Sequence, residues 1–384
     1  MLFFLNSAIF LFKKTQDFRK MPTEKQIIER IAEGNLALPP LTIRLLKNKP
    51  APEDNLFTDI VIEVEWQMKK TKFAVALKSI STPKVFQASL NQLKMMSPPK
   101  NYGLMLIMPF LNDDQLYELE SNGISGIDLC GNGVVIAPGT LAVFRSGGKN
   151  RFPSSALIKN IYRKNSSMVS RAFLALPRYN TVQEICEEVN NLNMLVSSWN
   201  KTPMSISTVS KVLKTLEEDL IISRKDAICL LQPDKLLDKL SEYYSPVVIK
   251  KVIRLKLMVE NESMIQTLWE AAQQAGLPLV ATGTSSVSQY AVMQRGDVLS
   301  LYCPRIERIA EMLPGSQSDR FPNLELIETE DETVFFDARE QQNFRWASPI
   351  QVYLELMAGD KRDRETAGQL KSFILKNISN RKLG

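Results

Sequence analysis

The chain has 384 residues, enough for two or three domains, and its composition of 44% hydrophobic and 23% charged residues is that of a globular protein. It contains no histidine, which excludes Ser-His and Cys-His nucleophilic pairs, histidine general bases and histidine metal ligands. The four cysteines are widely spaced without a CxxC pair, so we expect no metal and no cofactor; with no secretory signal recognised, they predict a cytoplasmic protein.

The net charge of +6 is unevenly distributed along the chain. Residues 1–256 contain 35 lysines and arginines against 24 acids, whereas residues 257–384 contain 13 against 18. A basic front part is typical of proteins that bind a polyanion such as DNA, although solvated surface lysines give the same count.

Residues 1–22 are predicted to be a disordered or artefactual extension ahead of the first domain. The apolar stretch 1–12 is well short of the roughly 20 residues that a membrane helix needs, so no membrane partner is predicted. An interfacial anchor is the alternative interpretation of this stretch.

Residues 23–150 predict an α/β domain. Helices are expected over 23–50, strands over 57–66 and 71–80, a helix from Pro83, a strand over 103–110, a helix over 112–120 and short strands over 126–144. This order resembles the restriction-endonuclease-like fold.

Nucleases of that type hold Mg²⁺ with an acid on one strand and an acid-x-lysine triplet on the next. Here Asp59 begins the first strand and Lys78 ends the second, but Ala76 occupies the position of the second acid. The sequence therefore favours an inactive scaffold. The alternative is a Mg²⁺-dependent nuclease of the PD-(D/E)XK type in which Glu63 or Glu65 replaces the missing acid.

Residues 151–245 predict a basic linker helix (151–164) followed by a central winged helix-turn-helix. Three helices are expected, the second capped by Thr181 and Glu184, and then a hairpin that pairs 220–222 with 227–231. The segment 190–203 between the second and third helices is longer than the usual turn.

The third helix, from Ser205, has two distinct faces. Its predicted inner face carries Ile206, Val209, Leu213, Leu216 and Leu220. Small hydroxyls and lysines on the outer face suit the major groove, and cations at the hairpin tip suit the phosphate backbone. The predicted DNA contacts are Ser207, Lys211, Lys214, Thr215, Arg224 and Lys225. A helical bundle, or a winged helix that binds protein, is the alternative.

Residues 246–384 alternate helix and strand and resemble a degenerate nucleotidyltransferase fold. The turn Gly283-Thr-Ser-Ser is similar to the glycine-serine turn before a nucleotide site, and Asp297 follows it. Leu299 stands where a second metal-binding acid is required. This predicts a catalytically silent domain, because one acid cannot hold two Mg²⁺ ions.

Several segments resemble AbiEi-like proteins, the winged-helix antitoxins and repressors of type IV toxin–antitoxin systems. They are Ile127-Asp128-Leu129-Cys130-Gly131-Asn132, then Ala137-Pro-Gly and Asn150-Arg-Phe-Pro-Ser, and finally Ala347-Ser-Pro-Ile-Gln-Val-Tyr-Leu-Glu-Leu with Arg364-Glu-Thr-Ala. Only a subset of AbiEi-like proteins carries a nuclease-like front domain.

The resemblance implies a non-enzymatic regulator that binds double-stranded DNA and represses its own transcription. It also implies that the carboxy-terminal domain opposes a toxin with a nucleotidyltransferase fold. The nuclease and an interaction protein that binds no DNA remain the alternatives. The sequence specifies neither the operator, nor the cognate toxin, nor the oligomeric state.

Overall fold

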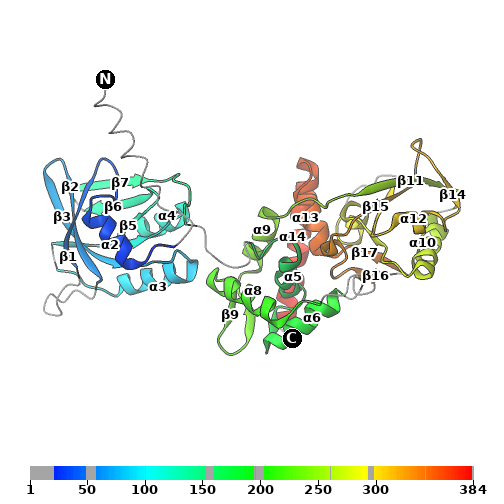
Figure 1. Cartoon of the computed structure of the whole chain (residues 1–384), viewed down its shortest axis with the longest axis horizontal. Coiled ribbons are helices and arrows are strands. Elements are labelled where there is room, and N and C mark those ends of the chain that lie inside the picture. Colours follow the sequence, from blue (N-terminus) through cyan, green and yellow to red (C-terminus); the bar gives the residue numbers. More distant parts are fainter. Residues whose placement is uncertain are drawn as a thin grey trace, which may run out of the picture. The chain divides into compact units, whose positions relative to one another are not determined.

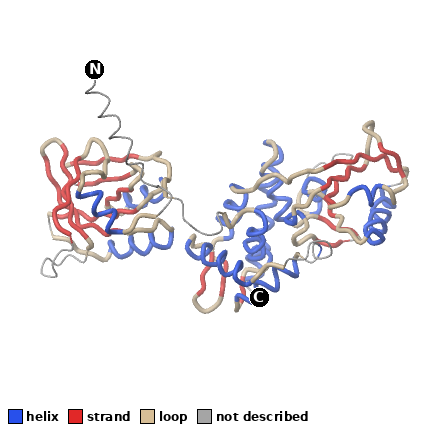
Figure 2. Tube along the Cα trace, viewed as in Figure 1, coloured by secondary structure: helices blue, strands red, loops and turns tan. Residues whose placement is uncertain are grey.

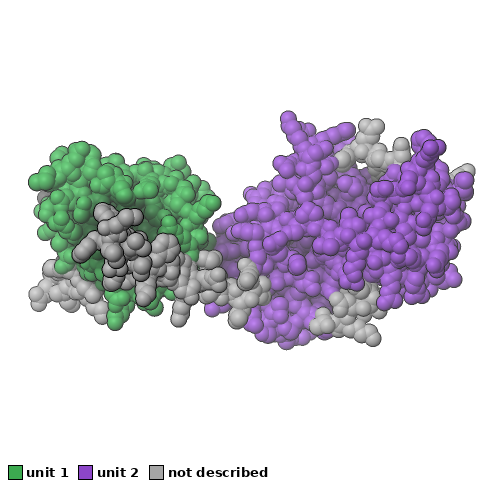
Figure 3. Space-filling model, turned by 45° about the horizontal axis from the view of Figure 1, so that its top comes forward, with its two compact units in different colours: residues 1–157 green, residues 158–384 purple. Residues whose placement is uncertain are grey.

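The computed structural model describes residues 21–48, 58–99, 101–137, 139–152, 160–193, 195, 203–259, 261–292, 298–341 and 343–382. The chain is mixed α/β, and the described residues form three sheets. It divides into two compact units, residues 1–157 and 158–384 (Figure 3). Within the described residues no helix is long and apolar enough to cross a membrane. The predicted extension falls almost entirely on residues 1–20, which lie outside the described part.

Unit 1, residues 1–157, is built on a seven-stranded sheet whose strands follow one another in chain order (Figures 1 and 2). The strands are β1 (Thr42–Asn48), β2 (Ile60–Trp66), β3 (Lys69–Leu77), β4 (Tyr102–Met108), β5 (Ser125–Asp128), β6 (Gly133–Ala137) and β7 (Leu141–Arg145). Strands β3, β4 and β5 are parallel, and the other neighbours are antiparallel.

Helices cover both faces of this sheet. Helix α2 (Glu24–Ala32) buries Ile27 against one face, whereas α3 (Pro83–Lys94) and α4 (Asp113–Ser121) bury Phe86 and Leu116 against the other. Thr82 and Asn112 cap α3 and α4 by accepting hydrogen bonds from backbone N–H groups three residues on. These two helices form the crossovers that parallel strands require.

The prediction of helices throughout residues 23–50 is wrong in its second half. Gly34 adopts a left-handed conformation with φ of 71° just after α2, which reverses the chain. Strand β1 then pairs with β2, so that Ile43 faces Val64 in the core. The other elements predicted for this unit are present within a few residues of their expected bounds.

The first part of unit 2 combines helices with a small sheet of order β8-β10-β9. Its elements are α5 (Ser167–Ala175), β8 (Arg178–Tyr179), α6 (Val182–Leu192), α8 (Ile206–Glu218), β9 (Ile222–Arg224), β10 (Ile228–Leu230) and α9 (Pro233–Glu242). The predicted linker helix is wrong where it can be checked: residues 160–163 form a turn and Lys164–Ser166 a single 3-10 turn. Residues 153–159 lie outside the described part.

The second part of unit 2 contains a sheet of order β14-β11-β15-β13-β12-β17-β16. Its strands are β11 (Lys251–Leu257), β12 (Val280–Ala281), β13 (Leu299–Cys303), β14 (Gly315–Gln317), β15 (Leu324–Glu328), β16 (Arg339–Gln341) and β17 (Phe344–Trp346). Its helices are α10 (Asn261–Ala275), α11 (Gly283–Ser286), α12 (Ile306–Ala310), α13 (Pro349–Met357) and α14 (Lys361–Lys382).

The two parts of unit 2 share one hydrophobic core. Side chains alternate along β13, so that Leu301 packs with α10 and α12 while Tyr302 faces the opposite side. On that side lie α13 and α14, and their apolar residues form one cluster with α5, α6, α8 and α9. The sequence predicts a domain boundary at residue 245, whereas the contacts place residues 158–384 in a single compact unit.

Candidate nucleic-acid interface

Helix α8 presents a polar face to solvent because four of its five apolar residues are buried on the other side. Val209, Val212, Leu213 and Leu216 are its buried residues, and Ser205 caps its start by accepting from the Thr208 backbone N–H at 3.2 Å. Ser207, Lys211 and Lys214 are exposed, whereas Thr215 is half-buried. The Thr215 hydroxyl donates to the Lys211 carbonyl at 3.4 Å, so it is partly engaged within the helix.

The prediction that Ile206 belongs to the buried face of α8 is wrong. Its side chain is 50% exposed, and Val212 is buried instead. At roughly 100° per residue the buried face is centred between Val209 and Val212, which leaves Ile206 on the flank of the first turn.

The β9–β10 hairpin contacts α8 (Figure 1) and carries two further exposed cations. The strands pair Ile222 with Leu230 and Arg224 with Ile228, so Arg224 ends β9 and Lys225 lies in the connecting turn. The predicted start of the hairpin at Leu220 is wrong, because this residue forms the turn after α8 with a positive φ of 58°.

The exposed residues Ser207, Lys211, Lys214, Arg224 and Lys225 are called the α8 surface below. None of its four cations forms an ion pair with any described residue, which leaves their charges available to an external anion. Lys239 differs, since its Nζ lies 3.8 Å from the Asp219 carboxylate.

The far end of α8 is anchored by contacts that the sequence did not indicate. Asp219, the C-cap of α8, accepts a 2.5 Å hydrogen bond from the Tyr162 hydroxyl, and Lys239 lies 5.3 Å from the centre of the Tyr162 ring. Burial raises the pKa of Tyr162 above its ordinary value, so the hydroxyl stays protonated and keeps donating. These contacts tie the end of α8 to Tyr162 and Lys239.

A buried arginine connects α5, which packs against α8, to the second part of unit 2. Arg171 is 2% exposed and donates to the Thr333 carbonyl at 3.0 Å and to Gln351 Oε1 at 2.8 Å. Gln351 Nε2 in turn donates to Glu355 Oε1 at 2.8 Å. Burial lowers the pKa of Arg171 and raises that of Glu355. The sequence offered no signal for this network, in which the bonded residues Arg171 and Gln351 lie 180 residues apart.

Glu355 also occupies the glycine-serine turn that resembles a nucleotide site. The Gly283 backbone N–H donates to Glu355 Oε2 at 2.7 Å, and a Cβ at position 283 would lie only 2.5 Å from that oxygen. The amide that begins α11 therefore binds a carboxylate of the same chain. Asp297 lies outside the described residues, and Leu299 is the first residue of β13.

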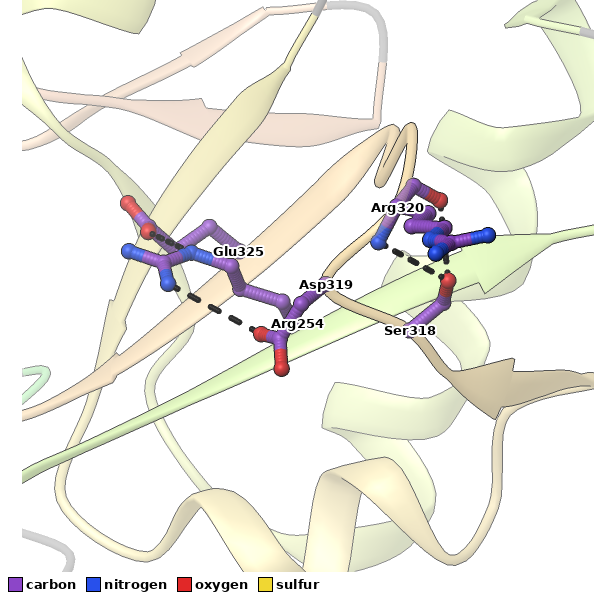
Figure 4. Close-up of polar contacts among 5 residues, drawn as sticks. All are labelled: Arg254, Ser318, Asp319, Arg320 and Glu325. Atoms are coloured by element: carbon purple, nitrogen blue, oxygen red, sulfur yellow. Dashed lines mark hydrogen bonds and ion pairs between the residues drawn. The ribbon is translucent and has the colours of Figure 1, made fainter.

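A second acid near this turn is neutralised by an arginine on β11 (Figure 4). Arg254 Nε donates to Glu325 Oε1 at 3.0 Å, and its guanidinium lies 3.8 Å from Asp319. Glu325 Oε2 accepts from the Ser300 hydroxyl at 3.2 Å. This carboxylate is already satisfied by its own chain.

In unit 1 Asp59 and Lys78 both lie at one end of the antiparallel β2–β3 pair, since Asp59 precedes β2 and Lys78 follows β3. Asp59 is exposed, and its Oδ2 accepts from the Leu77 backbone N–H at 2.7 Å. Ala76, at the position of the missing acid, is 1% exposed and packs in the apolar core with Phe86. A carboxylate would have no room for hydration there.

The two substitute acids do not reach this end of the strand pair. Glu63 and Glu65 are four and six residues from Asp59, which is about 13 and 20 Å along a strand. Glu63 lies 3.1 Å from Lys70, and Glu65 lies 3.6 Å from Arg44. No group of three or more acids or cysteines within the described ranges is placed to hold a metal ion.

The segment around Asp128 forms a buried hydrogen-bonding hub. Asp128 Oδ1 accepts from the backbone N–H groups of Cys130 at 2.7 Å and Asn132 at 2.8 Å. Its Oδ2 accepts from the Leu111 N–H at 3.0 Å and from Asn132 Nδ2 at 2.6 Å. Asn132 Oδ1 then accepts from the Gly148 N–H at 2.6 Å, which ties the end of the domain to its sheet.

The role of this hub is structural rather than chemical. Burial raises the pKa of Asp128, although four N–H groups donate to the carboxylate. The side chain is fully buried, so nothing outside the domain reaches it.

Comparison of the chain with protein-family models, with curated proteins and with solved structures finds no match.

Proposed function

We propose that this protein is a winged-helix DNA-binding regulator of antitoxin type, which represses its own transcription. The observation that carries the proposal is the α8 surface, on which four cations without partners among the described residues project from one helix and the adjoining hairpin. Electrostatic attraction of this kind supplies much of the affinity of proteins for the DNA backbone.

The arrangement of elements supports the winged-helix interpretation. Three helices, α5, α6 and α8, are followed by a two-stranded hairpin, and β8 adds a third strand beside β10. In helix-turn-helix proteins the recognition helix lies in the major groove and its first turns contact base edges. Helix α8 has small side chains on its outer face, which allow the close approach that a groove of about 12 Å requires.

We assign the DNA contacts as follows. Ser207 and Lys211 lie nearest the start of α8 and read base edges, whereas Lys214 contacts phosphate further along the helix. Arg224 and Lys225 hold the backbone beside the helix. Thr215 contributes less than the sequence predicts, because its hydroxyl donates within α8.

The second part of unit 2 is proposed to oppose a nucleotidyltransferase-like toxin, directly or functionally, and to be catalytically silent. Two contacts support the proposal that this part has no catalytic activity: Glu355 binds the Gly283 amide, and Arg254 neutralises Glu325. The likeness of residues 347–356 to the carboxy-terminal motif of AbiEi-like proteins supports the antitoxin assignment.

The test is binding to labelled duplexes from the region upstream of the protein's own gene, compared with a scrambled duplex at low and near-physiological salt. Preferential binding that survives the higher salt is expected. Weak binding that is equal on both duplexes and disappears with salt would overturn the regulator proposal. It would favour an interaction protein in its place.

One observation favours a second candidate, a Mg²⁺-dependent nuclease: Asp59 accepts a hydrogen bond from the backbone N–H of Leu77, the residue before Lys78. Against it, Ala76 is buried and the substitute acids lie far along the strand. Plasmid cleavage with Mg²⁺ or Mn²⁺ that Asp59→Ala abolishes would establish the nuclease. We expect no cleavage.

A further inference from the structure

Ile206 is an apolar residue placed where a recognition helix reads bases. It is the first residue of α8, and its side chain is 50% exposed although the apolar residues of the following turns are buried. The hydroxyl of the neighbouring N-cap residue Ser205 already accepts a hydrogen bond from the Thr208 N–H at 3.2 Å. The first turn therefore offers solvent the side chains of Ile206 and Ser207.

The position of Ile206 on the helix matters as much as its exposure. At roughly 100° per residue Ile206 and Ser210 share one flank of α8, and Lys214 and Ser207 follow on the adjoining polar face. Residues one turn apart on the same flank face successive base pairs of a groove that the helix enters by its N-terminal end. The exposed part of the Ile206 side chain thus lies at the edge between the buried face of α8, which includes Val209 and Leu213, and its polar, cationic face.

Only one feature of the major groove is chemically complementary to an aliphatic side chain, and it is the C5-methyl group of thymine. We infer that Ile206 contacts a thymine methyl group and makes this protein selective for a thymine at one position of its site. The inference rests on the proposed DNA-binding function and adds to it the class of base that the first turn of α8 recognises.

The size of the effect follows from the area that such a contact removes from water. Burial of one methyl group contributes about a fourfold change in affinity. Deoxyuridine pairs as thymine does and lacks only this methyl group. It therefore removes the proposed contact without altering the other groups in the groove.

The experiment begins by selecting the highest-affinity duplex from a random-sequence pool with the full-length protein. That duplex is then synthesised with each thymine replaced in turn by deoxyuridine. For the wild-type protein we expect one position at which the replacement lowers affinity about fourfold. For Ile206→Ala we expect the thymine and deoxyuridine duplexes to bind equally at that position, whereas Ile206→Val retains most of the difference.

Leu231→Ala is the matched control, because Leu231 is also 50% exposed but follows β10 at the base of the hairpin, away from its tip. It should keep the full thymine preference. An Ile206→Ala protein that keeps that preference, or a selected duplex in which no deoxyuridine lowers wild-type affinity, would overturn the inference while DNA binding stands. A pool from which no sequence is enriched would overturn the proposed function itself.

Discussion

The Asp128 hub allows a stability prediction that can be worked out atom by atom. In Asp128→Asn one carboxylate oxygen becomes an NH₂ group that cannot accept a hydrogen bond. If the NH₂ replaces Oδ1, the backbone N–H groups of Cys130 and Asn132 both lose their acceptor. If it replaces Oδ2, Leu111 N–H loses its acceptor, but Asn132 Nδ2 keeps the Gly148 carbonyl at 3.1 Å.

The second orientation therefore costs less free energy. It leaves the Leu111 N–H and the new NH₂ group buried without acceptors. Each such group costs about 1–3 kcal/mol. Part of this is offset because the variant no longer buries a charge, as the raised pKa of Asp128 indicates. The expected net loss in the free energy of unfolding is about 2–4 kcal/mol.

Hydrogen exchange read by mass spectrometry is the suitable assay, since the chain has two compact units and a single unfolding midpoint would combine them. Exchange in peptides covering β4 to β6 should accelerate by about 30- to 900-fold at neutral pH. Asp59→Asn is the control, because that exposed side chain keeps an oxygen that accepts the hydrogen bond from the Leu77 N–H. Exchange in Asp128→Asn within twofold of the wild type would refute the reasoning.

Three further predictions concern unit 2. Lys225→Ala should lower the slope of log affinity against log salt for duplex DNA by about 0.9. Lys250→Ala should leave that slope unchanged, because the Lys250 ammonium already pairs with Glu330 at 2.6 Å. Gly283→Ala should destabilise unit 2 by about 1–3 kcal/mol, measured by hydrogen exchange in its peptides, because its Cβ would lie 2.5 Å from a carboxylate oxygen. Gly368→Ala, which meets open space in α14, should stabilise unit 2 by about 0.5–1 kcal/mol. Burial raises the pKa of Glu355 above 4.5, so the folded state binds the Glu355 proton more tightly than the unfolded chain does. The free energy of unfolding should therefore fall as pH rises from about 4.5 through the raised pKa. In Glu355→Gln, unfolding measured against pH should lack that decline.

Local signals in the sequence predicted most of the secondary structure, because caps and periodicity act over a few residues. Pro83, and Asn112 before α4, mark helix starts that the structure reproduces. The alternation of exposed and buried residues likewise predicted that Ser207, Lys211 and Lys214 share the exposed face of α8. Strand β1 was missed, because only its pairing with β2, a separate segment of the chain, makes it a strand.

The partners of polar side chains were beyond the sequence. Nothing near Arg171 indicates that it is buried, since its partners Thr333 and Gln351 come from the other end of unit 2. In the same way Glu63 and Glu65 looked like possible metal ligands until the strand register showed how far they lie from Asp59. Such distances follow from the tertiary arrangement, which no local pattern encodes.

The shared core of unit 2 limits how its gene can be rearranged. Leu240 of α9 and Ile374 of α14 belong to the same buried cluster, and Lys371 of α14 lies 2.7 Å from Asp238 of α9. A recombination event after residue 245 would expose the apolar sides of α5 and α9 to water. The part of unit 2 that contains α5, α6, α8 and α9 is therefore not a module that can be exchanged between genes. Selection on either half of residues 158–384 acts on both.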